Sequence, residues 1–292
     1  MAISIGIDIG GTFTDVVALD TNSGKVTVTK VPSTRKDFSQ GFFNGLDKIL
    51  TMTGSSPVDV QRLVHGTTVA TNAILEYKGS KLGILTTNGF RDTLIIGREF
   101  RTEMYSVMFD PETPTFLCDR ERIIEIETRV DSQGNVLTPL NEADVVKAID
   151  FLVEKHGVEA IVICYLFSFL NSTHEDRTEQ IIRERYPHIR VSLSHKLNPR
   201  FREYERMVIT AFDAYIGPEM ERYISKLKEG IRDRNIDVVL QVMQSRGGIT
   251  SATMCMEKPV VTLLSGLAGG VIGGRFIGNL CGRENIITLD TG

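Results

Sequence analysis

Two aspartates around a pair of glycines are the first residues in the chain whose types and spacing could bind a ligand or support a reaction. Residues 8–15 read Asp-Ile-Gly-Gly-Thr-Phe-Thr-Asp. Paired glycines let the backbone approach a phosphate without an intervening Cβ and expose N–H donors to it, and a carboxylate such as Asp8 can hold Mg²⁺ through water. We predict a phosphate-binding turn with donors from Gly10, Gly11, Thr12 and Thr14. The alternative is an ordinary hairpin turn in which glycine supplies a positive φ.

A second glycine-rich segment lies near the other end of the chain. Residues 265–270 read Ser-Gly-Leu-Ala-Gly-Gly, and the pattern after them predicts a helix over 271–281. Helix N-termini that follow glycine-rich turns bind anions through free N–H groups, which makes Gly266, Gly269 and Gly270 candidate phosphate ligands. The alternative is close packing of a helix through small residues, because these glycines recur at helical spacing.

The last residues repeat the chemistry of the first turn. Residues 286–292 read Ile-Ile-Thr-Leu-Asp-Thr-Gly, which has the character of a strand and ends in Asp290, Thr291 and Gly292, the same Asp-x-Gly pattern as Asp8 to Gly10. Two such loops that face each other could clamp a nucleotide and one metal ion.

Two further motifs carry polar side chains, and each has a simple structural explanation. Residues 65–72, His-Gly-Thr-Thr-Val-Ala-Thr-Asn, place an imidazole and three hydroxyls around a strand-to-helix turn. The structural interpretation, in which Thr67 or Thr68 caps the helix and His65 is a satisfied strand end, is favoured over a ligand role. Residues 202–206, Arg-Glu-Tyr-Glu-Arg, are more simply a solvated helix face with charge pairs than a substrate site.

The elements that must position these motifs alternate between strands and helices. Alternating isoleucines predict a strand over 3–9, and strands over 12–20 and 25–31 complete a three-stranded meander. The pattern then predicts helices over 38–50, 69–77, 141–155 and 175–185, and strands over 62–65, 81–86, 120–130, 160–167, 189–194 and 238–243. A long helical region over 201–234 is expected to be interrupted at Gly217-Pro218. A change of character near residue 198 predicts two domains, 1–198 and 199–292.

Composition excludes several classes of protein. The chain has 292 residues, with 33 Lys and Arg against 37 Asp and Glu, and carries no dense basic block, so we expect no nucleic-acid partner. Its longest uncharged run, residues 259–274, is too short and too glycine-rich to cross a membrane, and the N-terminus has no basic region of a signal peptide. We therefore expect a cytoplasmic protein with no membrane partner. The four cysteines form no CxxC pair, which argues against a disulfide framework or a structural zinc site.

Five ordered segments together resemble the A-type, nucleotide-binding subunit of the hydantoinase/5-oxoprolinase family, which includes subunits of acetone and acetophenone carboxylases. They are residues 8–15, 65–73, 86–92, 202–206 and 243–248. The resemblance implies an α/β, actin-like ATPase fold with two RNase-H-like halves around a nucleotide cleft, the first complete and the second cut short at Gly292. Two residues depart from the family pattern, Leu267 in place of a proline and Arg246 in place of an asparagine.

The resemblance also implies a reaction, in which ATP phosphorylates the carbonyl oxygen of a cyclic amide, such as hydantoin, 5-oxoproline or a related lactam, so that the ring can be hydrolysed. ATP and Mg²⁺ would be the cofactors, with Asp8 and Asp290 organising the metal and Asp8, His65 and Thr67 acting in catalysis. A B-type subunit is the implied partner. The alternatives are an ATP-dependent ketone carboxylase, a small-molecule kinase of the same fold, and a non-catalytic module. A shortened second half predicts exposed apolar surface around residues 271–290 and association, including a homo-oligomer.

Overall fold

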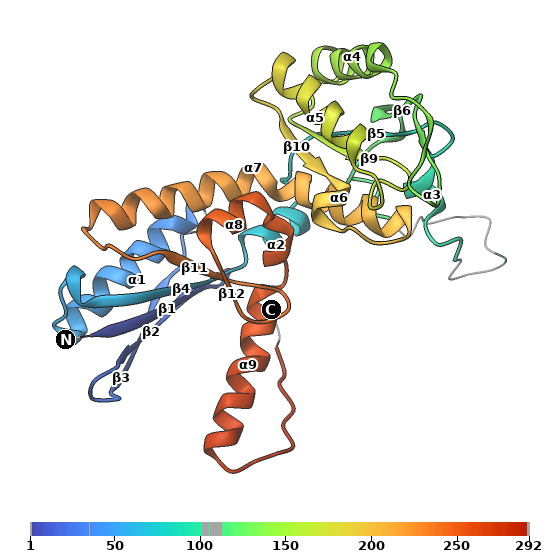
Figure 1. Ribbon diagram of the computed structural model, residues 1–292. Coiled ribbons are helices and arrows are strands. Elements are labelled where there is room, and N and C mark those ends of the chain that lie inside the picture. Colours follow the sequence, from blue (N-terminus) through green and yellow to red (C-terminus); the bar gives the residue numbers. More distant parts are fainter. Residues whose placement is uncertain (1, 35, 101–104, 106–112, 291–292) are drawn as a thin grey trace. The chain divides into compact units, whose positions relative to one another are not determined.

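The computed structural model describes residues 2–34, 36–100, 105 and 113–290, which fall into two compact units (Figure 1). The first unit combines Met1–Lys78 with Glu219–Gly292, and the second is Gly79–Pro218. The compact units therefore divide at residues 78 and 218, and the division at residue 198 stays a prediction about domain organisation in the family.

The first unit contains a six-stranded sheet with the order β12-β11-β4-β1-β2-β3. Its strands are β1 (Ile3–Ile9), β2 (Phe13–Asp20), β3 (Val26–Pro32), β4 (Val60–Thr67), β11 (Leu240–Met243) and β12 (Ile249–Ser251). The first three strands form the predicted antiparallel meander. Strands β1, β4 and β11 are mutually parallel, and β12 pairs antiparallel with β11.

Helices surround this sheet: α1 (Phe38–Thr53), α2 (Val69–Leu75), α8 (Ala252–Glu257) and α9 (Ser265–Leu280), with short 3₁₀ turns at Pro57–Asp59 and Pro259–Thr262. Helix α1 packs against β1, β2 and β3, as Figure 1 shows. Its N-terminus is capped by Asp37, which accepts a hydrogen bond from the Ser39 N–H, and it ends at Gly54 with φ of 65°. Phe42 and Leu46 of α1 are fully buried with the alternating isoleucines of β1, which explains the period-two pattern of residues 3–9.

The second unit is built on a four-stranded, all-parallel sheet with the order β10-β9-β5-β6. Its strands are β5 (Leu82–Thr87), β6 (Ile123–Ile126), β9 (Ala160–Cys164) and β10 (Arg190–Leu193), and β7 (Arg129–Val130) with β8 (Val136–Thr138) forms a separate hairpin. Its helices are α3 (Thr93–Ile96), α4 (Glu142–Asp150), α5 (Thr173–Arg185) and α6 (Ser194–Leu197), with a 3₁₀ turn at Arg120–Arg122 and a π-helical turn at Phe151–Lys155. Every residue of β9 is buried, as predicted for an apolar strand covered by helices.

Helix α7 (Glu203–Asp233) runs through both units and is continuous, so the predicted interruption at Gly217-Pro218 is wrong. Tyr215 and Ile216 before the proline and Met220 after it are buried, and this packing outweighs the hydrogen bond that the proline removes.

Two predictions for the last forty residues are also wrong. Helix α9 begins at Ser265 and not at 271, so the glycine-rich segment lies inside the helix. Residues 286–290 are extended but belong to no strand. Figure 1 shows α9 extending away from the sheet, with the chain returning along it.

Helix α9 and the returning segment expose large apolar side chains, as the sequence predicts for residues 271–290, and the association expected from them stays a prediction. They are Leu267, Val271, Ile272, Phe276, Ile277, Leu280, Ile286, Ile287 and Leu289. Among the described residues, no helix is both long enough and apolar enough to span a membrane.

Candidate functional site

The segments that the sequence predicts to bind phosphate meet where parallel strands of the first unit end. Strands β1 and β4 are paired so that Asp8 lies opposite Gly66 and Ile9 opposite Thr67. Helix α9 contacts β4 and the neighbouring strand β11. The carboxyl ends of parallel strands in α/β sheets are the usual place for ligands. The sheet therefore brings together the turn after β1, the turn after β4 and the start of α9. We call this place the phosphate edge, after the binding role that the sequence predicts for it.

The carboxyl group of Asp8 is the chemical centre of this edge. It reaches solvent, but partial burial raises its pKa, and the nearby carboxylates of Asp15 and Asp290 raise it further. Gly66 leaves the space that this carboxyl group occupies, because a Cβ on Gly66 would stand 2.4 Å from Asp8 Oδ1. A pKa raised by other carboxylates indicates that a cation placed among them would be stabilised.

The turn after β1 presents some of its predicted donors to solvent and turns others inward. Gly11 and Thr12 are exposed, whereas the side chain of Thr14 is fully buried. Ser33 holds the turn: its hydroxyl donates to the carbonyl of Gly10 at 2.8 Å and lies 2.9 Å from Thr14 Oγ1. The Ser33 N–H also donates to the carbonyl of Thr12 at 2.9 Å. Thr14 therefore shapes the turn through Ser33 and does not itself reach the surface.

The glycines of α9 form a packing surface and not a turn. Cβ atoms built on Gly270, Gly274 and Gly278 would lie 3.8 Å from an Asp290 oxygen, 2.3 Å from Thr288 Cγ2 and 1.9 Å from Ile286 Cδ1. Alternate residues of the returning segment thus lie against glycines four residues apart on the helix, which is the small-residue packing that the spacing also allowed. This packing carries Asp290 to the start of α9, where its charge acts on Asp8.

The start of α9 is fastened to the end of β4. The Ser265 hydroxyl donates to the carbonyl of Thr67 at 3.1 Å, and the Leu264 N–H donates to Thr71 Oγ1 at 3.4 Å. Gly266 and Gly269 lie within the first turns of this helix, where a Cβ would come no closer than 3.7 Å to any neighbour. The helical hydrogen bonds of α9 begin at Ala268, whose N–H donates to the carbonyl of Leu264 at 3.2 Å. Gly266 precedes that point, in the first turn that favours anions, whereas Gly269 and Gly270 follow it. The phosphate-binding role of these three glycines stays a prediction. Thr291 and Gly292 lie outside the described residues.

The structure places His65 in the core of the first unit. The Ile7 carbonyl can only accept, so Nδ1 donates to it at 3.1 Å, and Nε2 then accepts from the Tyr223 hydroxyl at 2.7 Å. Burial lowers the pKa of His65 to about 4, so the ring is neutral at physiological pH. Thr67 is likewise buried, and its hydroxyl accepts from the Val69 N–H at 3.2 Å. Both side chains fasten β4 to its neighbours and lie behind the phosphate edge, so their catalytic role stays a prediction.

Two aspartates can hold Mg²⁺ at this edge. The described residues contain no cluster of three or more His, Cys, Asp or Glu with metal-binding geometry. Magnesium needs fewer protein ligands, because it keeps several waters and binds through one or two carboxylates together with substrate phosphates. The charge of Asp290, which raises the pKa of Asp8, fits that arrangement.

Residues 202–206 are not the solvated face that the charges suggest. Arg206 is fully buried in the second unit, where its guanidinium donates to Ser194 Oγ, to the carbonyl of Tyr165 and to the carbonyl of Arg200. The prediction of charge pairs holds for Glu205, which is paired with Arg98 and Arg202.

Gly66 and Ser33 were missed by reasoning from the sequence. Gly66 is part of the 65–72 motif, but the sequence alone does not explain why a glycine is needed at this position. The reason is its partner in the parallel pairing with β1, 58 residues earlier. Ser33 carries no signal of its own, because a serine after a strand is common in turns.

Known families and curated proteins match almost the whole chain. The family model for the hydantoinase/oxoprolinase N-terminal region matches residues 4–186, and that for hydantoinase/oxoprolinase matches residues 206–292. The chain is 33% identical to caprolactamase subunit alpha of Pseudomonas jessenii over 99% of its length and 42% of the relative's. It is also 33% identical to the acetophenone carboxylase gamma subunit of Aromatoleum aromaticum, over 99% of this chain and 41% of that one.

Solved structures show the same fold. The crystal structure of ATP-dependent caprolactamase from Pseudomonas jessenii aligns with a TM-score of 0.83 at 32% identity, covering 99% of this chain and 42% of that one. The nucleotide-free structure of acetone carboxylase aligns with a TM-score of 0.85 at 26% identity, covering 96% of this chain and 41% of that one. The chain thus has the predicted actin-like ATPase fold and spans about two-fifths of the length of these relatives.

Proposed function

The chain belongs to the hydantoinase/oxoprolinase family, and from this premise we propose that it is the nucleotide-binding part of an ATP-dependent hydrolase of cyclic amides. The observation that carries the proposal is the placement of Asp8, Asp290 and the start of α9 at one edge of the sheet. That edge has the exposed backbone donors and carboxylates that a Mg·ATP phosphate chain requires.

The chemistry explains why a cyclic amide needs ATP. An amide carbonyl resists attack by water, and its oxygen is a poor leaving group. Transfer of the γ-phosphoryl group to that oxygen breaks the bond from phosphorus to the bridging oxygen of ATP, releases ADP and leaves an imidate phosphate. The amide nitrogen loses its proton in this step. Water then adds to the activated carbon, and the carbon–nitrogen bond breaks, so that the ring nitrogen takes up a proton and leaves as the amine. A second water hydrolyses the resulting acyl phosphate to a carboxylate and inorganic phosphate.

Phosphoryl transfer requires positioning and charge stabilisation more than covalent chemistry from the protein. The exposed backbone of Gly11 and Thr12 and the start of α9 would hold phosphate oxygens. The Gly10 N–H donates to the carbonyl of Phe13 at 3.0 Å, so Gly10 would act together with Ser33 in keeping the first turn in shape. Magnesium bound by Asp8 and Asp290 would neutralise charge on the phosphates. Gly66 supports this arrangement indirectly, because it keeps the Asp8 carboxyl group in place.

A ketone carboxylase subunit is the second candidate function. It is favoured by a single observation, the equal 33% identity to caprolactamase subunit alpha and to the acetophenone carboxylase gamma subunit. The same activation serves both reactions, because an enol oxygen can accept the phosphoryl group as an imidate oxygen does. The two functions differ in whether water or bicarbonate carbon takes part in the second step.

The experiment measures ADP release by the protein together with its B-type partner subunit. Caprolactam, 5-oxoproline and hydantoin are compared with acetone and acetophenone, each with and without bicarbonate. We expect a cyclic amide to stimulate ADP release without bicarbonate, and Asp8→Asn to abolish the stimulation. Asp20→Asn, in an exposed turn of the same unit, is the matched control and should retain it. Stimulation only by a ketone with bicarbonate would overturn the hydrolase proposal in favour of the carboxylase.

A further inference from the structure

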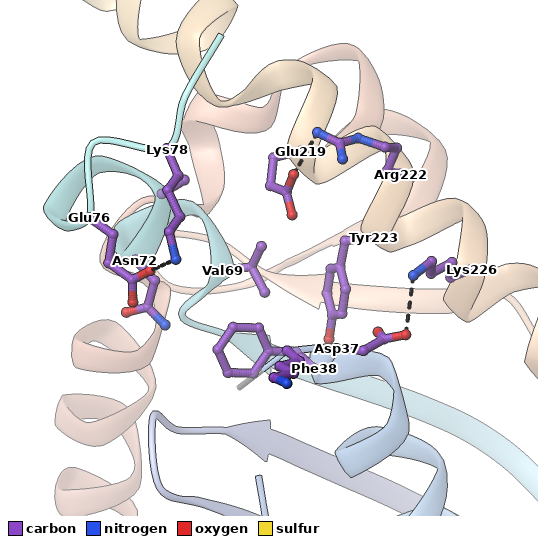
Figure 2. Close-up of a pocket in the computed structure, with 12 residues that line it drawn as sticks. Asp37, Phe38, Val69, Asn72, Glu76, Lys78, Glu219, Arg222, Tyr223 and Lys226 are labelled. Carbon is purple, nitrogen blue, oxygen red and sulfur yellow. Dashed lines mark hydrogen bonds and ion pairs between the residues drawn. The ribbon is translucent and has the colours of Figure 1, made fainter. Parts of the chain in front are cut away.

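A cavity in the first unit shares no residue with the phosphate edge. It has a volume of about 610 Å³, within the range of small-molecule sites. Figure 2 shows that its walls come from the start of α1, from α2 and the residues after it, and from the middle of α7. Phe38, Val69 and Ala73 form apolar parts of the lining, and the ring of Tyr223 forms another.

Charged side chains of both signs surround this apolar lining. Lys36, Lys78, Arg222 and Lys226 are cationic, and Asp37, Glu76 and Glu219 are acidic. Six of these seven side chains form three ion pairs: Lys226 with Asp37 at 3.1 Å, Arg222 with Glu219 at 2.7 Å, and Lys78 with Glu76. Figure 2 shows these pairs on different sides of the cavity.

Paired charges select a particular ligand chemistry. A ligand with only a negative charge would be attracted by the lysines and the arginine but repelled by the carboxylates paired with them. A ligand with only a positive charge would be attracted by the carboxylates and repelled by the cations. A ligand with one carboxylate and one ammonium group can join both signs at once, while its carbon chain lies on the apolar lining.

We propose that this cavity binds a zwitterionic amino acid, the class of product that ring opening of a cyclic amide creates. The identity of the ligand as product rests on the proposed function, because hydrolysis of a lactam yields one amine and one carboxylate on the same carbon chain. The binding of a zwitterion rests only on the charges and the apolar surface of the cavity.

Two hydrogen-bonded paths lead from this cavity to the phosphate edge. The Tyr223 hydroxyl donates to His65, which donates to the carbonyl of Ile7. Asn72 Nδ2 donates to Thr68 Oγ1 at 3.3 Å, and that hydroxyl donates to the carbonyl of Ile9 at 3.1 Å. The two carbonyls lie on either side of Asp8. A ligand against Tyr223 and Asn72 therefore acts on the strand that positions the Asp8 carboxyl group, which gives the product a route to regulate the nucleotide site.

The test uses 6-aminohexanoate as the probe and isothermal titration calorimetry of the 292-residue chain in the absence of nucleotide. We expect saturable binding at one site, with hexanoate and hexylamine each at least about tenfold weaker, because each lacks one charge-assisted hydrogen bond. Glu219→Gln and Arg222→Gln should each weaken binding of 6-aminohexanoate by about tenfold. Glu229→Gln and Lys228→Gln, exposed residues of the same helix outside the cavity, are the matched controls and should leave binding unchanged.

Circular dichroism of each variant checks folding, and ¹⁵N spectra of the His65 ring report the hydrogen-bonded path. We expect the ring resonances to move with the same midpoint as the calorimetric titration, and unmoved resonances would overturn the link to Asp8. Absence of saturable binding, or equal binding of the singly charged probes, would overturn the site itself. If the zwitterion binds but no cyclic amide stimulates ADP release, the site stands and its assignment to a product falls. Stimulated ADP release without zwitterion binding overturns the site and leaves the proposed function intact.

Discussion

Replacing Gly66 with alanine should damage nucleotide binding far more than folding. The added Cβ would stand 2.4 Å from Asp8 Oδ1, whereas ordinary contacts begin at 3.4 Å, so the carboxylate oxygen must move by about 1 Å. Asp8 is at the solvent edge and can rotate, so the free energy of unfolding should fall by only about 1 kcal/mol. A shift of about 1 Å breaks contacts to a magnesium ion or a phosphate, because both depend on narrow geometry.

The assay compares Mg·ATP affinity by calorimetry with stability by urea unfolding. Gly66→Ala should lose at least about tenfold in affinity, equivalent to one charge-assisted hydrogen bond, and should approach the affinity of Asp8→Asn. Gly6→Ala is the matched control, because its Cβ would lie 3.2 Å from Val17 Cγ1 in the same sheet and would not touch Asp8. Normal affinity in Gly66→Ala, with affinity lost in Asp8→Asn, would refute the reasoning that this glycine positions the carboxylate.

Three further predictions concern polar side chains that hold neighbouring segments together. Ser33→Ala removes the hydroxyl that holds the first turn and should cost about 1–2 kcal/mol in urea unfolding and reduce Mg·ATP affinity, whereas unchanged affinity would count against its role. His65 has a pKa of about 4 when folded against about 6.5 when unfolded, so the unfolded chain binds the extra proton. The contribution of the neutral ring to the free energy of unfolding is complete above pH 6.5 and declines by about 3 kcal/mol as the pH falls to 4. In His65→Gln, the free energy of unfolding in urea should depend less on pH over this range. An unchanged pH dependence would contradict the assignment. Arg206→Lys should destabilise the chain by about 2–4 kcal/mol, because a lysine cannot reproduce three bonds from one guanidinium, while exposed Arg202→Lys should stay within about 0.5 kcal/mol; equal effects would show that burial of Arg206 is unimportant.

Local patterns predict most of the strands and helices of this chain. Alternating isoleucines place β1 with one face buried, and the apolar run at 160–167 places β9 (Ala160–Cys164) in a covered sheet. Both signals depend only on neighbouring residues and their period. The glycine-rich turn after β1 is equally local, because a β-meander needs a turn there.

The errors arise where a distant part of the chain decides the structure. Glycine disfavours a helix, so residues 265–270 suggest a turn, yet the returning segment needs a helix surface without side chains. The proline of α7 suggests a break, but buried residues on both sides keep the helix continuous. The closeness of Gly66 to Asp8 and the burial of His65 both depend on the register of the parallel pairing between β1 and β4. The spacing of residues in the sequence does not define that register.

The central claim is that the edge formed by Asp8, Gly66, Asp290 and the start of α9 holds the phosphates of Mg·ATP. Calorimetry of Mg·ATP binding to the 292-residue chain, beside Asp8→Asn and the control Asp20→Asn, tests it most directly. We predict one site with magnesium-dependent affinity that is lost in Asp8→Asn and kept in Asp20→Asn. Equal affinity in all three proteins, or no binding by the folded chain, would contradict the claim.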